Sequence, residues 1–299
     1  MTIEDDGRIS GFAIVVKPAG VTSYRLIASL GKLLGDKTKS GHAGTLDSFA
    51  SGVLVCLFGR YTRLSDYFMG AGKGYDADVL LGEETDTLDP SGRIIATGPI
   101  PTQEEIERVL PRFRGDILQA PPAYSAVHIQ GERAYERALK GQDVRPEPRP
   151  VTIQSLELLS YSGGTARIRV ACSKGTYIRS LARDIALAVG TRGRLAALRR
   201  TFSGPYTVES AAPAGGFNKD RLRKLTMGDA AGLGITVHQI DMASSKAFRN
   251  GLPLFRLGAF TALDSSKPVA VFDPDGDFLG IISKAGPNWR YAFVLGGSD

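Results

Sequence analysis

A glycine-rich stretch that leads straight into an apolar run constrains this chain more than any other feature. The stretch, Gly41 to Gly52, has the sequence GHAGTLDSFASG, and the apolar run extends from Val53 to Phe58. Its three glycines let the backbone bend where other residues are excluded, and the run predicts a buried strand. Asp47 is therefore expected on a tight loop beside a rigid element, where catalytic groups are often found. Aspartate is also a common turn residue, so spacing alone leaves a purely structural role open.

Length and charge limit the class of protein. The 299 residues suffice for one large domain and a small one, and the formal net charge of +6 at pH 7 favours a polyanionic partner. The two cysteines, Cys56 and Cys172, lie in apolar surroundings, which argues against a disulfide framework or a thiolate metal site. The first apolar run is too short for a signal peptide, and no segment reaches membrane-spanning length, so we expect a cytoplasmic protein.

Hydrophobic patterning predicts most elements before residue 200. The expected strands are Phe12 to Val16, Val53 to Phe58, Tyr75 to Leu81, Ile153 to Leu159 and Ala166 to Ala171. One helix is expected after Thr22 or Ser23, one after the capping box Thr102 to Glu105, and one from Ile178. Residues 119–150 are rich in proline and in both charges, which fits either a mobile insertion over a substrate or a solvated loop.

The last third of the chain differs from the rest in composition and in its hydrophobic pattern. Residues 203–234 are rich in glycine and alanine and predict a connector with one helix near Leu222. From about residue 235 the pattern is β-like, because Val269 to Phe272 and Phe278 to Ile282 flank the turn-forming sequence DPDGD and predict a hairpin. Trp289 to Leu295 predicts one more strand.

Three segments carry a family resemblance. The glycine-rich stretch resembles the G-H-x-G-T-L-D-P-x-A-x-G-V-L signature of the TruB family of tRNA pseudouridine synthases, with Ser48 where proline is usual. Proline would fix the backbone there, so its absence removes one restraint on the loop. Lys174 to Arg179 is similar to the family's K-G-T-Y-I-R motif, and Pro121 to Val127 resembles P-P-x-Y-S-A-V/L-K, with His128 in place of lysine. The resemblance covers nearly the whole chain.

The resemblance implies an α+β pseudouridine synthase fold, in which a central mixed, largely antiparallel sheet is flanked by helices. It implies a catalytic domain at 1–234 with an RNA-covering insertion at about 119–150, and a small β-barrel-like PUA-type RNA-binding domain at 235–299. The implied reaction isomerises uridine 55, flipped out of the T loop of tRNA, to pseudouridine. No atoms are gained or lost, so no cofactor or metal is required. The expected partner is the T arm of tRNA, bound by a monomer that needs neither a membrane nor another protein.

The resemblance also implies roles for individual residues. It makes Asp47 the catalytic residue and Arg179 its ion-pair partner, and a nearby arginine would favour the ionised carboxylate. It assigns roles in substrate binding or site support to Tyr75, Tyr177, Arg179, His42 and Lys17, with Tyr75 stacking on the target base. Whether Asp47 first attacks C1′, attacks C6 or removes a ribose proton stays open.

A basic cluster and three alternative functions complete the expectations. Phosphate contacts would offset the cost of extruding a base and are expected from Arg192, Arg194, Arg199 and Arg200. One alternative is a non-catalytic RNA-binding module that helps tRNA fold, and a second is a related synthase inside a guide-RNA particle. A third is a glycosidase-like hydrolase, which needs a second carboxylate that no motif places beside Asp47.

Overall fold

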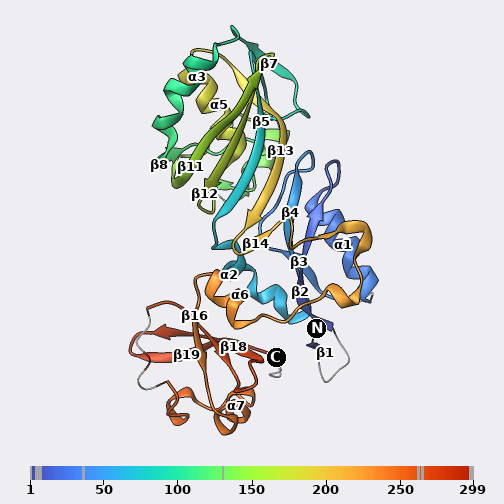
Figure 1. Ribbon diagram of the computed structural model, residues 1–299, viewed down its shortest axis with the longest axis vertical. Coiled ribbons are helices and arrows are strands. Elements are labelled where there is room, and N and C mark those ends of the chain that lie inside the picture. The colour runs from blue at the N-terminus through green and yellow to red at the C-terminus, as the bar shows by residue number, and fades with distance from the viewer. Residues whose placement is uncertain are drawn as a thin grey trace.

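One mixed sheet organises the backbone (Figure 1). The computed structural model describes residues 2–3, 9–35, 38–129, 131–260, 263 and 266–295. Within these residues the largest sheet has eleven strands. Its main path follows β1 (Thr2–Ile3), β2 (Ile9–Lys17), β4 (Ser51–Phe58), β13 (Gly193–Ser203), β5 (Lys73–Leu81), β12 (Thr165–Cys172), β11 (Arg149–Ser162) and β8 (Gly115–Gln119). The strands β3 (Ser40–His42), β14 (Tyr206–Thr207) and β15 (Ala212–Pro213) join it at the sides of β4, β13 and β2.

The pairing in this sheet is antiparallel except where β13 meets β4 and β15 meets β2. Gly52 decides the first of these junctions. Its φ is +114°, and a Cβ there would lie 2.2 Å from the carbonyl oxygen of Arg200. Only glycine therefore lets β13 approach the chain just after Asp47 this closely.

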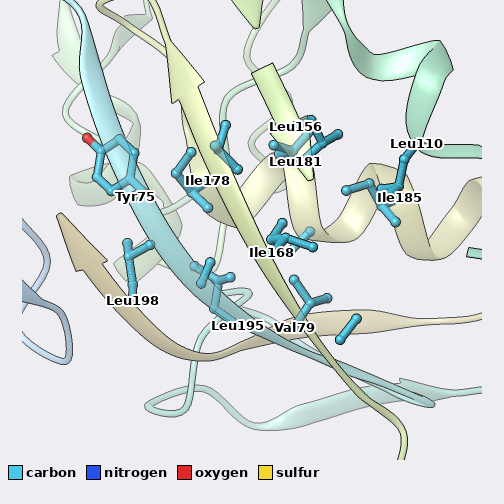
Figure 2. Close-up of a cluster of buried hydrophobic side chains, with 14 of the residues drawn as sticks. Tyr75, Val79, Leu110, Leu156, Ile168, Ile178, Leu181, Ile185, Leu195 and Leu198 are labelled. Carbon is cyan, nitrogen blue, oxygen red and sulfur yellow. The ribbon is translucent and has the colours of Figure 1, made fainter. Parts of the chain in front are cut away.

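Helices cover one face of the sheet and enclose its main hydrophobic core. α5 (Ile178–Ala188) lies against β5 and β13, and α3 (Gln103–Val109) packs beside it. Figure 2 shows the side chains between them, among them Tyr75, Leu181 and Leu195. A second helix layer, α1 (Ser23–Leu34), packs on β2 and β4. The predicted capping box is confirmed, because Thr102 and Glu105 exchange both hydrogen bonds at the start of α3.

Shorter elements connect these layers. They are η1 (Gly59–Leu64), α2 (Ser65–Met69), β6 (Glu83–Thr85), β7 (Ile94–Thr97), η2 (Leu110–Phe113), η3 (Ala214–Gly216) and η4 (Lys219–Arg221). Residues 119–150, called the insertion below, contain β9 (His128–Ile129), β10 (Glu132–Arg133) and α4 (Ala134–Leu139). A small hydrophobic cluster within the insertion includes Ala134, Ala138 and Val144.

The C-terminal part forms a separate sheet of β16 (Thr236–Gln239), β17 (Val269–Phe272), β18 (Phe278–Ala285) and β19 (Asn288–Val294). It is accompanied by α6 (Met227–Gly232), α7 (Met242–Arg249) and η5 (Leu254–Arg256), and it lies at the end of the molecule opposite α3 and β7 (Figure 1). The predicted hairpin is confirmed, since β17 and β18 pair antiparallel. One hydrophobic cluster joins this sheet to the larger one through Phe12, Tyr61, Phe278 and Phe293.

Two parts of the structure differ from the sequence-based expectation. Gly193–Ser203 is a central strand, β13, which the pattern did not predict. The helix expected near Leu222 is only the short 3-10 helix η4, which ends at Arg221; Leu222 is extended, and α6 begins five residues later, at Met227. The reason is an edge contact, because Arg223 exchanges backbone hydrogen bonds of 3.0 and 2.8 Å with Phe12 in β2. None of the helices in the described ranges has the length and apolar character needed to cross a bilayer.

Candidate active site

A cavity of about 970 Å³ opens between the Asp47 loop (residues 43–50), the large sheet, the start of α5 and the insertion. Four of the predicted site residues line it together, although they come from distant parts of the chain: Asp47, Tyr75, Tyr177 and Arg179. His42 and Lys17 do not line it. The structure therefore separates the predicted residues into a group that faces the cavity and a pair that lies behind it.

Buried side chains hold the backbone of the Asp47 loop on both sides of Asp47. The Ser23 hydroxyl accepts from the Leu46 amide at 3.0 Å and donates to the Leu46 carbonyl at 2.9 Å. The Ser48 carbonyl accepts from the Gly20 amide at 2.7 Å and from Lys17 Nζ at 3.3 Å. The position where proline is usual is thus restrained by hydrogen bonds to its carbonyl oxygen instead of by a ring.

Lys17 is a support of this loop. Its side chain is fully buried, and Nζ also donates to the carbonyls of Val21 at 2.6 Å and Pro18 at 2.9 Å. Burial lowers the pKa of Lys17 to about 8, although the charge of Asp47 opposes the shift. With its three protons directed at three carbonyls, Lys17 has no proton left for a substrate.

Arg179 binds Asp47 from the start of α5. Its Nε lies 3.0 Å from Asp47 Oδ2, and its Nη2 donates to Asp47 Oδ1 at 3.2 Å. The arginine side chain is 8% exposed, whereas the Asp47 side chain is 35% exposed. The pair therefore presents a charged carboxylate to the cavity while its counter-ion stays covered.

Two further contacts fix the guanidinium of Arg179. It donates to the Thr87 carbonyl through Nη1 and to the Tyr124 carbonyl through Nη2, both at 3.0 Å. The Tyr124 carbonyl belongs to the insertion, so the insertion touches the partner of Asp47 directly.

The sequence did not single out Asp89, although it lies behind the same arginine. Asp89 Oδ2 is 3.7 Å from Arg179 Nη1, and the carboxylate is buried. Its Oδ1 accepts from the Thr87 hydroxyl and from the backbone amide of Ser91. The adjacent Leu88 has φ of +61°, a conformation that is rare for residues other than glycine. The Asp-Pro-Ser-Gly sequence indicated only a turn, and nothing local connects it to a residue ninety positions later.

Burial keeps the aromatic and imidazole groups near Asp47 uncharged. It raises the pKa of Tyr75 and Tyr177, so both remain neutral phenols at neutral pH. Figure 2 shows Tyr75 at the edge of the core with its hydroxyl pointing away from the other labelled side chains. Burial and the charge of Arg200 lower the pKa of His42, which favours the neutral ring.

The four arginines expected to contact phosphate have different surroundings. Arg200 is 1% exposed and donates to the carbonyls of Val53 at 2.7 Å and Gly44 at 3.1 Å, so the prediction of a phosphate contact is wrong for it. Arg192 and Arg194 pair with Glu84 and Glu83. Arg199, on the other face of β13, is exposed.

Comparison with known proteins decides the family. A model of the TruB family pseudouridylate synthase N-terminal domain matches residues 32–178. Over 284 residues the chain is 40% identical to tRNA pseudouridine synthase B of Pseudomonas fluorescens strain Pf0-1, which covers 91% of both chains. The chain belongs to the TruB family of pseudouridylate synthases. It is therefore an isomerase, and the reading as a non-catalytic RNA-binding module is wrong.

Other relatives and structures agree. The chain is 46% identical over 207 residues to tRNA pseudouridine synthase B of Bordetella pertussis, covering 68% of this chain and 84% of that one. A chain in the crystal structure of a Cbf5–Nop10–Gar1 complex superposes with a TM-score of 0.70 at 23% identity, covering 98% of this chain and 88% of that chain. At that identity the likeness shows the fold alone. The expected α+β fold with a small C-terminal sheet is confirmed.

Proposed function

We propose that this TruB family enzyme converts uridine 55 in the T loop of tRNA to pseudouridine, with Asp47 as the catalytic group. The observation that carries the proposal is the Arg179–Asp47 pair, in which two nitrogens of a covered guanidinium face a carboxylate open to the cavity. The named relatives, which are tRNA pseudouridine synthases, support tRNA as the substrate.

The cavity suits an extruded nucleotide. A base inside a folded loop must leave its stack before an enzyme can reach C1′. This unstacking costs roughly a few kcal/mol of free energy. Tyr75 and Leu198 offer a flat apolar surface on the sheet side, and Tyr177, the residue before α5, also lines the cavity. Asp47 then stands beside the ribose, where its negative charge can serve C1′, C6 or a ribose proton. The nucleotide keeps its composition, because the hydrogen lost from C5 is balanced by one gained at N1, so the reaction calls for no cofactor.

Supporting residues complete the proposed site. Lys17 and Ser23 fix the backbone around Asp47, so we assign them to positioning and not to substrate contact. His42 is proposed to meet RNA beside the cavity, since it precedes the Asp47 loop at the end of β3. We further propose that the enzyme acts as a monomer on the T arm without a guide RNA or protein partner.

Tritium release from tRNA carrying [5-³H]uridine tests this function, because bonding of C5 to C1′ expels the C5 hydrogen. Purified enzyme alone should release tritium from wild-type tRNA and not from tRNA with cytidine at position 55. Asp47→Asn should abolish release while tRNA affinity stays within about tenfold, since the change keeps shape and removes charge. Normal release by Asp47→Asn, or a requirement for an added guide RNA, would contradict the proposal.

A further inference from the structure

Two cations line the sheet side of the cavity, and neither forms an ion pair with a carboxylate within the residue ranges that the structure describes. Lys73 of β5 is 8% exposed and Arg200 of β13 is 1% exposed. Among the described residues the ionisable groups that act on the pKa of Lys73 are Arg200, Cys172 and Lys174, and none of them is a carboxylate. Burial raises the pKa of the Cys172 thiol to about 11, so it is neutral at neutral pH. Buried cations are normally paired because removing a charge from water is unfavourable. An unpaired cation at a cavity wall therefore suggests that a ligand supplies the negative charge.

Strand register places both cations next to Tyr75. Arg200 stands directly opposite Tyr75 in the antiparallel β13–β5 pair, and Lys73 lies two residues before it on the same face. A Cβ on Gly44 would lie 3.4 Å from Lys73 Cε and 3.7 Å from Arg200 Nη1, so the Asp47 loop crosses over both side chains. The two cations thus adjoin the surface on which the target base is proposed to stack.

Lys73 keeps a proton for a ligand. Its Nζ donates to the carbonyls of Met69 at 3.1 Å and Ala71 at 3.0 Å. These contacts hold the ammonium group in place and leave one of its three protons without an acceptor in the described part of the chain. Arg200, by contrast, is engaged with the carbonyls of Val53 and Gly44.

The chemistry of the reaction explains why a cation belongs beside the base. If Asp47 attacks C1′ or removes a ribose proton, the electron pair of the C1′–N1 bond leaves with the uracil and spreads over O2 and O4. If Asp47 attacks C6, the charge appears on C5 and O4. In each route that electron density later forms the C5–C1′ bond, while the bond from Asp47 to C1′ or C6 breaks or the ribose proton returns from Asp47. C5 then loses its proton and N1 gains one. All three routes therefore place a negative charge on the uracil ring.

We propose that Lys73 is a further catalytic residue, which donates a hydrogen bond to a carbonyl oxygen of the uracil and stabilises its negative charge. Arg200 acts as a positioning residue. Its positive charge strengthens the positive potential at the uracil, and its side chain holds the Asp47 loop over Lys73. The inference rests on the proposed function, because it names a group that serves the same reaction. Donors aimed at developing charge typically contribute about 100- to 1,000-fold in rate.

A pH profile separates this role from packing. Burial, Arg200 and Lys174 lower the pKa of Lys73 to about 8, with Cys172 opposing them. Lys73 is therefore charged below pH 8, and the rate should fall as pH rises through that value. Lys17 has a pKa near the same value, so a variant must show which lysine is responsible.

The test measures single-turnover tritium release with saturating tRNA, and tRNA affinity by filter binding. Lys73→Met should slow turnover about 100-fold with affinity within about threefold. Lys73→Arg should stay within about tenfold of wild type and lose the decline above pH 8. The matched control is Lys32→Met, which removes an exposed cation of α1 that does not line the cavity and does not act on the pKa of Lys73. It should leave the single-turnover rate unchanged.

Chemical rescue excludes a folding defect. Ethylammonium should accelerate Lys73→Ala, whereas tetramethylammonium at equal ionic strength, which donates no hydrogen bond, should not. Wild-type turnover by Lys73→Met, or a decline above pH 8 that persists in Lys73→Arg, would overturn the role of Lys73 and leave the proposed function intact. A wild-type enzyme that releases no tritium from any tRNA would overturn the proposed function itself.

Discussion

The two walls of the cavity that meet at Arg179 are built differently. On one side, the Asp47 loop is bound by buried groups from β2, α1 and β13, which together reach the backbone of Gly44, Leu46 and Ser48. On the other side, the insertion depends on a small cluster of alanine and valine side chains and leaves much of its surface exposed. Both walls contact the same guanidinium, one through Asp47 and the other through the Tyr124 carbonyl.

This difference fits the separate tasks that the proposed function gives to the two walls. A carboxylate must keep its position to within a fraction of an ångström if it is to react, and the Asp47 loop meets that need. A surface that admits and covers RNA must move, and weakly packed segments are the ones that open. Arg179 couples the two tasks, because displacement of the insertion removes one acceptor from the partner of Asp47.

Removing that link should have the largest effect. Arg179→Met deprives Asp47 of its counter-ion and leaves the Tyr124 carbonyl without a donor, so single-turnover release should fall about 1,000-fold. Arg183→Met is the matched control, because Arg183 also donates to the insertion, at Ala120, but does not reach Asp47. Equal losses in the two variants would show that contact with the insertion, and not with Asp47, is what matters.

Loosening the Asp47 loop should have the second largest effect on turnover. Ser23→Ala leaves the Leu46 amide buried without a partner, which should lower the free energy of unfolding by about 1–3 kcal/mol and slow turnover about tenfold. Ser29→Ala, which removes a hydroxyl bonded only within α1, should change stability by less than about 0.5 kcal/mol. Urea unfolding and tritium release provide the two measurements. Full activity in Ser23→Ala would mean that catalysis does not depend on the restraint of the Asp47 loop by Ser23.

Loosening the insertion wall should have a local effect. Val144→Ala trims the small cluster by about 1 kcal/mol, so hydrogen exchange should quicken within 119–150 while the melting temperature of the protein stays unchanged. Val53→Ala, at a fully buried position of β4, should lower the melting temperature instead. A global loss of stability in Val144→Ala would show that the insertion folds as one unit with the sheet.

The last prediction concerns pH and stability. Burial lowers the pKa of Lys17 and Lys73 from 10.5 to about 8, so between those values the unfolded chain binds more protons than the folded one. Their contribution to the free energy of unfolding therefore rises from pH 8 toward 10, while turnover falls. Lys17→Met should flatten that rise in urea titrations. If wild-type stability and turnover fall together above pH 8, deprotonation of Lys73 does not explain the loss of rate.

The sequence predicts this site where chemistry is local and misses it where contacts are distant. The Asp47 loop and the start of α5 are continuous segments that carry the motifs of the family resemblance, so the sequence could suggest both Asp47 and Arg179, and the structure brings the two side chains together. Asp89 was missed because only the folded chain brings its turn to Arg179. β13 was missed because register shifts at Leu195/Ala197 and Arg200/Phe202 break its alternation, and its arginines suggested RNA contacts. Arg200 in fact lies beneath the loop, a position that no spacing rule indicates.

The aromatic cluster that joins the two sheets has a mechanical consequence. Phe12 and Tyr61 on one side and Phe278 and Phe293 on the other share a single apolar interior, so the C-terminal sheet cannot swing on a tether. A nucleic acid bound to the C-terminal sheet would therefore lie at a fixed distance from Asp47. Cutting the chain between the two sheets would expose a hydrophobic surface on each fragment, so neither fragment should remain soluble and monomeric.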